Sequence, residues 1–283
     1  MTLDKEINFF FLNNLKCFEY KPSVAVGVSG GPDSMALIYL VNKWIKVKKG
    51  KLIALIFDHS LRINSKEEAE QVKDMLHKMN IKSRIIKTKK NSLIKKNMAQ
   101  ARDNRFKGLI NHCLKNNIMH LFLGHHFDDN LETYLIRKIN GSNLEGLSSM
   151  NNIAYFNKIR IIRPFIEINK KSILNFNKKN KINFINDPSN SDINFTRVKI
   201  RNFLQNEVYK KLVKLDFIYL KRKIPDYKMM IWELLLNTLV KIQSNKIIIN
   251  SNILIKNDEL IIEKHILIFL KFFSSKKYQT KSS

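Results

Sequence analysis

The stretch Ser-Gly-Gly-Pro-Asp-Ser, residues 29–34, combines residue types that suit phosphate chemistry in a chain with only 8 glycines among 283 residues. Adjacent glycines, Gly30 and Gly31, let backbone N–H groups wrap closely around an anion, and the hydroxyls of Ser29 and Ser34 add donors. Asp33 would repel a phosphate directly, so its expected role is to hold a Mg²⁺ ion that bridges phosphates. The alternative, a plain strand–helix turn, explains the glycines but neither the serines nor the aspartate.

A second stretch, residues 125–132, gathers histidines and carboxylates. It contains His125, His126, Asp128, Asp129 and Glu132. The carboxylates fall at the start of a predicted helix, where they suit the helix dipole, so N-terminal capping is one explanation of them. The spacing of the histidines and aspartates fits no zinc pattern, and we expect a structural or substrate-orienting role for the histidines.

The elements that must position these residues alternate between strands and helices. The sequence predicts strands at 23–29, 51–60, 82–89 and 118–126, and helices at 1–20, 35–46, 65–80, 97–116 and 128–140. Ser65 and Glu68 form a capping-box pattern at the third helix. This alternation predicts an α/β fold, a parallel sheet with helices on both faces. Ligands of such sheets bind at the carboxyl ends of strands, where the glycine turn, Asp58–His59 and His125–Asp129 all fall.

Beyond residue 150 the alternation fades. Residues 161–165 are expected to be extended, 187–192 to form a loop, and the chain from 201 to be helical with a basic connection at 220–228. Residues 246–262 fit strands or a helix equally well, and the tail from 274 is expected to be disordered. We therefore expect a catalytic domain over 1–203 and a small, mainly helical region over 204–283.

Charge and cysteine content narrow the class of protein. The net charge of +27 and a pI near 10.0 indicate a polyanionic partner, nucleic acid first, although an AT-rich gene would also enrich lysine. Cys17 and Cys113 form no metal or redox pattern. The start of the chain lacks the features of a signal peptide, and no uncharged run is long enough to span a membrane, so the expected location is the cytoplasm.

The glycine turn resembles the pyrophosphate loop of the N-type ATP pyrophosphatases, which include amidotransferases, NAD synthetases, tRNA thiolases and lysidine synthetases. Four later segments, residues 57–65, 101–106, 124–150 and 162–165, together with 186–201, are similar to motifs of the tRNA(Ile)-lysidine synthetase family. Ser60 stands where that family has a glycine, and Val198 where it has an asparagine. The resemblance covers roughly residues 20–203 in order, and the remaining C-terminal region is short for the family.

The resemblance implies ATP-dependent ligation of free lysine to the wobble cytidine of tRNA(Ile) with a CAU anticodon. An adenylated cytidine is the intermediate, AMP and pyrophosphate are released, and a homodimer is the expected assembly. It implies that ATP and Mg²⁺ are held by Ser29, Gly30, Gly31, Pro32, Asp33 and Ser34, with Phe57, Asp58 and His59 flanking the adenosine. Asp33, Ser34, Asp128 and Asp129 are the expected catalytic residues.

For the other two substrates the resemblance implies separate groups of side chains. Asp128, Asp129 and Glu132 offer carboxylates to the cationic lysine, because residues 128 and 132 share one helix face. Arginines expected to contact phosphate or tRNA, with solvated surface charges or ion pairs as the alternative, are Arg102, Arg105, Arg163, Arg197 and Arg201. Two other functions stay open: a tRNA thiolase of the same ATPase class, and a non-catalytic tRNA-binding protein with a relic nucleotide site.

Overall fold

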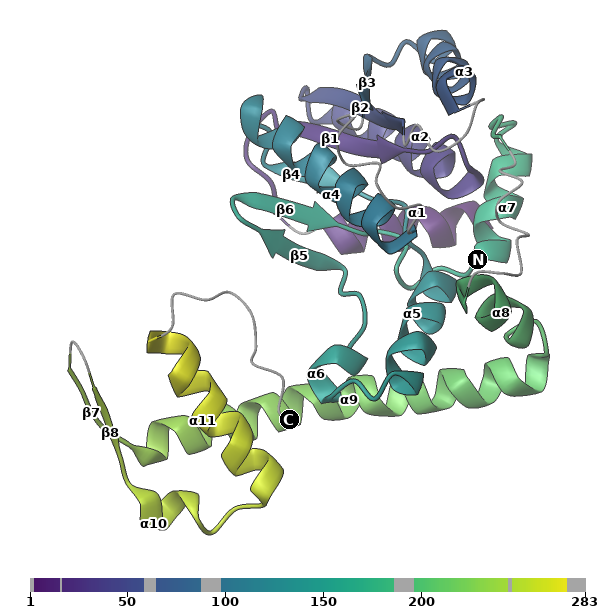
Figure 1. Cartoon of the computed structure of the whole chain (residues 1–283). Coiled ribbons are helices and arrows are strands. Elements are labelled where there is room, and N and C mark those ends of the chain that lie inside the picture. Colours follow the sequence, from purple (N-terminus) through teal and green to yellow (C-terminus); the bar gives the residue numbers. More distant parts are fainter. Residues whose placement is uncertain are drawn as a thin grey trace. The chain divides into compact units, whose positions relative to one another are not determined.

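The structure of the protein is a computed structural model, and it describes residues 3–15, 17–58, 65–87, 98–185, 196–243 and 246–273. The chain divides into two compact units. The first unit comprises Met1–Gly141 and Ser149–Val213, and the second comprises Ser142–Ser148 and Lys214–Ser283. Figure 1 shows the elements of both units.

The first unit is built on a six-stranded sheet with the order β3-β2-β1-β4-β6-β5. Its strands are β1 (Ser23–Val28), β2 (Lys51–Asp58), β3 (Ser83–Lys87), β4 (His120–Phe122), β5 (Ile153–Phe156) and β6 (Ile159–Ile162). All neighbouring pairs are parallel except β5–β6, an antiparallel hairpin at one edge. The expected parallel sheet is confirmed, with β5 as an antiparallel addition that the sequence did not predict.

Helices cover both faces of this sheet. The covering helices are α1 (Leu3–Leu15), α2 (Pro32–Val47), α3 (Ser65–Lys78), α4 (Met98–Lys115) and α7 (Lys170–Lys179), and the first unit also contains α5 (Phe127–Ile139) and α8 (Thr196–Phe203). Residues of α1, α2, α3 and α7 share one apolar core with Val24 and Val26 of β1, whereas α4 shares a second core with Ala25. The two cores exist because successive side chains of a strand point to opposite faces.

Strand order places a topological switch point of the sheet beside β1. Strand β1 pairs with β2 on one side and with β4 on the other, so the chain reverses its direction of travel across the sheet at this point. The loops that follow β1 and β4 leave the sheet at the same edge, because the two strands are parallel. An open α/β sheet binds its ligands at such a switch point.

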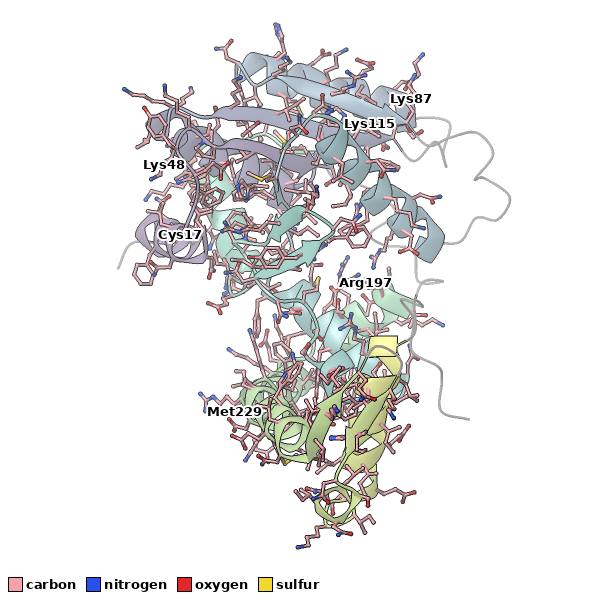
Figure 2. The ribbon with its side chains drawn as sticks, turned by 90° about the vertical axis from the view of Figure 1, so that its left-hand side faces the viewer. Cys17, Lys48, Lys87, Lys115, Arg197 and Met229 are labelled. Carbon is pink, nitrogen blue, oxygen red and sulfur yellow. The ribbon has the colours of Figure 1, made fainter. Side chains whose placement is uncertain are left out.

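The second unit consists of α6 (Leu144–Leu147), most of α9 (Glu207–Thr238), the hairpin β7 (Leu239–Ile242) and β8 (Ile247–Ile249), α10 (Ser251–Leu254) and α11 (Glu259–Phe273). The ambiguous stretch 246–262 therefore contains a strand, a short helix and the start of a longer helix. Lysines such as Lys48, Lys87 and Lys115 project from the surface of the first unit (Figure 2). None of the described helices is long and apolar enough to cross a membrane.

Candidate active site

The glycine loop, defined as residues 29–34, connects β1 to α2 in a conformation that requires glycine at position 30. Gly30 has a φ of +83°, and a Cβ built there would lie 2.5 Å from the Cγ2 atom of Val72. The carbonyl of Gly30 accepts a hydrogen bond of 2.9 Å from the backbone N–H of Ile185. A side chain at position 30 would therefore collide with Val72 of α3 and would be strained by the positive φ.

Serine side chains hold the two ends of the glycine loop together. The Oγ of Ser34 accepts from the backbone N–H of Ser29 at 3.2 Å and donates to the carbonyl of Gly31 at 3.0 Å, and it lies 3.3 Å from the Ser29 hydroxyl. Helix α2 then begins at Pro32 with Gly31 as its N-cap, and no side chain caps it. Backbone N–H groups at such a helix start, with the positive end of its dipole, attract an anion.

The loop between β4 and α5 lies directly against the glycine loop. A Cβ built on Gly124 would lie 3.1 Å from the carbonyl carbon of Asp33 and 3.2 Å from the nitrogen of Ser34. A side chain here would press on the backbone of the glycine loop, which would have to shift by a few tenths of an ångström. The histidine–carboxylate stretch is thereby placed beside the predicted phosphate site.

His126 begins α5 by a reciprocal cap. Its Nδ1 accepts from the backbone N–H of Asp129 at 3.3 Å, while its own N–H donates to the Oδ2 of Asp129 at 3.2 Å. With Nδ1 as an acceptor, the opposite ring nitrogen, Nε2, faces two carboxylates, 3.4 Å from Asp129 and 3.7 Å from Asp33. His126 therefore caps α5, in line with the structural role expected from the sequence. Its ring also connects α5 to Asp33 of the glycine loop.

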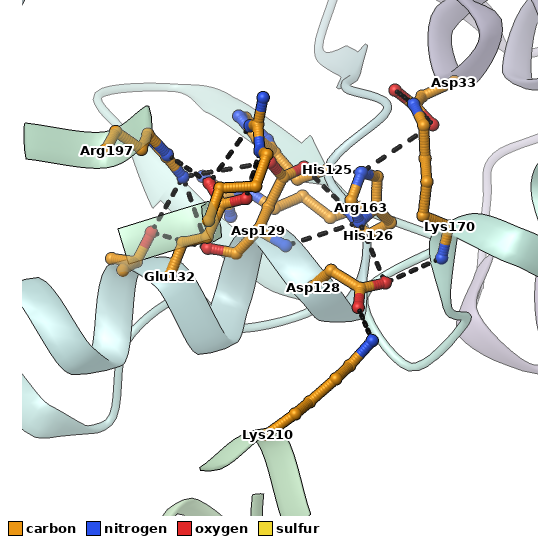
Figure 3. A network of polar contacts seen from close by, with 12 residues as sticks. Asp33, His125, His126, Asp128, Asp129, Glu132, Arg163, Lys170, Arg197 and Lys210 are labelled. Atoms are coloured by element: carbon orange, nitrogen blue, oxygen red, sulfur yellow. Dashed lines mark hydrogen bonds and ion pairs between the residues drawn. The ribbon is translucent and has the colours of Figure 1, made fainter. Parts of the chain in front are cut away.

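Lysines contact the carboxylates of Asp33, in the glycine loop, and of Asp128, in the first turn of α5 (Figure 3). The Nζ of Lys170 donates to Oδ1 of Asp33 at 2.6 Å and to Oδ2 at 2.5 Å, and the backbone N–H of Lys170 donates to Asp128 at 2.7 Å. Lys210 forms an ion pair of 2.8 Å with the other oxygen of Asp128. Burial opposes ionisation of Asp128, but these two donors hold its pKa below the usual value.

Glu132 is engaged by two arginines of α8. Its side chain is only 3% exposed, and it accepts from the Nε of Arg197 at 2.7 Å and from the Nε of Arg201 at 2.8 Å. Arg197 also donates to the Thr133 hydroxyl and to the carbonyl of Asp129. The hydrogen bond to Glu132 raises the pKa of Arg201. In this conformation both Glu132 oxygens serve to fix α8 against α5.

Arg102, Arg105 and Arg163, called the arginine cluster below, are partly or fully removed from water. Loss of hydration lowers the pKa of Arg102 to about 10, and the charges of Arg197 and Arg105 add to the effect. Loss of hydration also lowers the pKa of Arg105. Arg163 donates to Nδ1 of His125 at 3.3 Å, and loss of hydration together with the arginines lowers the pKa of His125 to about 3. His125 is therefore neutral at physiological pH.

Comparison with known proteins assigns this arrangement to a family. A family model described as a PP-loop domain matches residues 2–208 of the chain. The chain belongs to the PP-loop family. The match contains the glycine loop, α5, α7 and α8, so all the contacts described above except that of Lys210 lie within the PP-loop domain.

Two relatives of the PP-loop chain carry the same name. The tRNA(Ile)-lysidine synthase of Orientia tsutsugamushi is 35% identical over 231 residues, which cover 77% of this chain and 52% of the relative. The tRNA(Ile)-lysidine synthase of Wolbachia pipientis wMel is 36% identical over 225 residues, again covering 77% and 52%. The chain thus spans about half the length of the curated relatives it matches.

A solved structure shares the fold at lower identity. The U34-tRNA thiolase NcsA from Methanococcus maripaludis, determined with its [4Fe-4S] cluster, has a TM-score of 0.66 and 18% identity, and the match covers 79% of each chain. This likeness concerns the PP-loop fold alone, and it agrees with the mostly parallel sheet of the first unit.

The structure brings together most, but not all, of the residues expected at the PP-loop site. Phe57 and Asp58 end β2, and the Phe57 ring lies against α4, where a Cβ on Gly108 would approach its Cε2 to 2.6 Å. His59, Ser60 and residues 186–195 lie outside the described residues. Val198, where the resembled family has asparagine, is 7% exposed in α8.

Sequence reasoning missed Lys170 and Lys210. One signal could have found Lys170: it follows the N-cap Asn169 in the first turn of α7, where the helix dipole disfavours a cation. The ion pair with Asp33 offsets that cost. Lys210 lies in a run of basic residues on α9, and nothing in its local sequence distinguishes it from its neighbours.

Proposed function

We propose that the protein ligates free lysine to the wobble cytidine of tRNA(Ile) with a CAU anticodon, through an adenylated cytidine, with release of AMP and pyrophosphate. One observation carries the proposal: the glycine loop and the acidic start of α5 are in contact. Gly124 touches the backbone of Asp33, and Lys170 bridges Asp33 and Asp128. A site for ATP phosphates and carboxylates suited to an amine substrate thus share one sheet edge.

Residues of the glycine loop fit ATP carried with Mg²⁺. No group of three or more His, Cys, Asp or Glu side chains in the described part of the chain is arranged to hold a metal alone. Mg²⁺ commonly uses one or two carboxylates together with phosphate oxygens and water, which matches Asp33 beside the Ser29 and Ser34 hydroxyls. Bound there, the ion supplies neutralisation of phosphate charge. The loop N–H groups and α2 orient the phosphates, which is most of what adenylation requires.

Asp128 and Asp129 are proposed to hold the amine groups of free lysine. Asp128 already accepts the alkylammonium group of Lys210 at 2.8 Å, so its surroundings accommodate a cation of this chemistry. Burial opposes ionisation of Asp129, but His126, His125 and Arg197 lower its pKa, so it is a carboxylate at neutral pH. The sequence suggested the same role for Glu132. In the proposed site, Glu132 instead holds Arg197 and Arg201 in place through its two ion pairs.

The arginine cluster is proposed to receive the anticodon loop. Loss of hydration lowers the pKa of Arg102, Arg105 and Arg163, and the charges of Arg197 and Arg105 also repel Arg102, so an RNA phosphate would stabilise these guanidinium groups. An anticodon loop is single-stranded, so its wobble base can be unstacked at modest cost to reach the glycine loop. Residues 1–203 are proposed as the catalytic part, and the lysine-rich residues 204–283 as a region that docks the tRNA, with salt-sensitive binding.

A tRNA thiolase of the same ATPase class is the second candidate, favoured by the shared fold with NcsA. Sulfur transfer generally requires a reactive thiolate or a cluster. Burial raises the pKa of the Cys113 thiol to about 12, which disfavours its thiolate. Cys17 precedes β1 at the opposite end from the glycine loop, and it lies apart from Arg197 in Figure 2. We therefore prefer lysine ligation.

The test supplies purified protein with ATP, Mg²⁺, radiolabelled lysine and a tRNA(Ile) transcript that carries the CAU anticodon. We expect label in the tRNA that depends on ATP and that falls at least about 100-fold in Asp33→Ala, since preorganised charge at the phosphates is lost. Pyrophosphate release without label would remove the lysine substrate but keep the ATPase. Binding of tRNA with neither signal would favour a non-catalytic protein with a relic site.

A further inference from the structure

Lys170 and a metal ion claim the same two oxygen atoms. The ammonium of Lys170 lies 2.6 Å from Oδ1 and 2.5 Å from Oδ2 of Asp33, so both carboxylate oxygens are engaged (Figure 3). Asp33 is the carboxylate proposed to hold Mg²⁺ with the ATP phosphates. An ammonium that contacts both oxygens competes with the ion for their lone pairs and repels it, so binding of one cation at Asp33 weakens binding of the other.

The backbone around Lys170 keeps its ammonium near the phosphate site after it leaves Asp33. The Lys170 N–H donates to Asp128 at 2.7 Å, and Asn177, on the same helix, donates to the Pro32 carbonyl in the glycine loop at 2.8 Å. Helix α7 is therefore fixed against both loops of the site. Only the side chain of Lys170 is free to swing, and its side chain is 35% exposed.

From these contacts we infer that Lys170 is a phosphate ligand whose ammonium rests on Asp33 until Mg²⁺ and ATP arrive and then moves to a phosphate oxygen. The inference rests on the proposed ATP binding and not on lysine or tRNA as substrates. Asp33 gives up one cation and gains another, so the negative charge of the carboxylate is balanced in both states. The displaced ammonium meets the polyphosphate, whose charge exceeds what one Mg²⁺ neutralises.

Equilibrium dialysis of ATP over a series of Mg²⁺ concentrations tests this exchange in Lys170→Met. At saturating Mg²⁺ we expect ATP affinity to fall about tenfold, the value of one charge-assisted hydrogen bond. The Mg²⁺ concentration needed for half-maximal ATP binding should fall several-fold, because the competing ammonium is gone. Lys171→Met is the matched control, since Lys171 is the next residue in α7 and is exposed; it should bind as the wild type does.

Two results would overturn the inference. One is a Lys170→Met protein that binds ATP and Mg²⁺ as the wild type does, and the other is weaker ATP binding with an unchanged Mg²⁺ requirement. Lys170→Gln, which keeps a donor but no charge, carries the same test if the methionine variant does not fold. The measurement uses neither tRNA nor lysine, so a failure of lysine transfer leaves it intact, whereas a wild type that binds no ATP removes the proposed function itself.

Discussion

Helices α2 and α5 both begin directly after a parallel strand of the same sheet, yet they begin in opposite ways. The start of α2 has glycine as its N-cap and no side-chain cap. The start of α5 is closed by the reciprocal bonds of His126 and Asp129. The first N–H groups of a helix without a side-chain cap are open to water or to a ligand, whereas those of a capped helix are already engaged by the chain. We read α2 as the end that receives a ligand and α5 as the end that positions acids.

The largest effect is expected where α5 is joined to α8. Glu132→Ala should lower the free energy of unfolding by about 2–3 kcal/mol, because Arg197 and Arg201 lose a buried partner. The loss stays below the full cost of a buried pair because the Arg201 side chain is 39% exposed. Urea denaturation measures it. Glu70→Ala is the control, since Glu70 pairs with Lys73 at the surface and should change stability by less than about 0.5 kcal/mol.

Variants of two neighbouring glycines test whether the start of α2 receives a ligand. Gly30→Ala should cost about 1–3 kcal/mol of stability, because its φ is positive and its Cβ would collide with Val72. Gly31→Ala should cost less, about 0.5–1 kcal/mol from the poorer N-cap alone, since its Cβ meets only the Ser29 hydroxyl at 3.6 Å, yet it should weaken ATP binding. Thermal unfolding and ATP dialysis separate the two effects. If Gly31→Ala binds ATP normally, the phosphates do not approach α2 as proposed.

Removing the cap of α5 is expected to have a smaller effect. His126→Ala should lower the free energy of unfolding by about 1 kcal/mol, the usual value of an N-cap side chain. His126→Asn should recover most of that loss, because asparagine also accepts from a backbone N–H at this position. Denaturant titration of both variants decides the matter. Equal losses in the two variants would mean that the ring contributes through Asp33 and not through the cap.

The smallest effect concerns pH. The folded-state pKa of His125 is lowered below its unfolded value, so the unfolded chain binds a proton that the folded chain does not, and stability falls as the pH drops below about 6.5. Between pH 7 and pH 6 the contribution is about 0.7 kcal/mol. We expect His125→Gln to lose this part of the pH dependence in urea titrations at the two pH values. An identical slope in the variant would contradict the assignment.

Much of this comparison was predictable from the sequence, because it depends on local patterns. Apolar runs predicted four strands, and the residues after β1 and β4 were expected at one edge because parallel strands end together. The predicted helix at 35–46 is extended to Pro32 because proline suits the first helical position. The Ser65 capping box stays a prediction, since residue 64 lies outside the described residues.

Pairings between distant segments were not predictable. Nothing near Glu132 shows that its carboxylate accepts from Arg197 and Arg201, because these partners are brought there by the packing of α8 on α5. The contact of Lys170 with Asp33 likewise depends on where α7 returns along the sheet. The roles of Asp33, Asp128 and Asp129 toward substrates stay predictions. Residue types indicated the chemistry, and only the three-dimensional structure shows which charges are already paired.

The second unit is assembled from two separate parts of the chain, with α6 contributed by an excursion at Ser142–Ser148. Within it, Glu145 accepts from Lys264 of α11 at 2.6 Å. During synthesis the excursion leaves the ribosome long before α11 does, so this unit can be completed only after the first unit has had time to fold. A stop codon after residue 213 would therefore remove α11 and leave Glu145 of α6 without Lys264. A variant that lacks the whole second unit must also have residues 142–148 replaced by a linker.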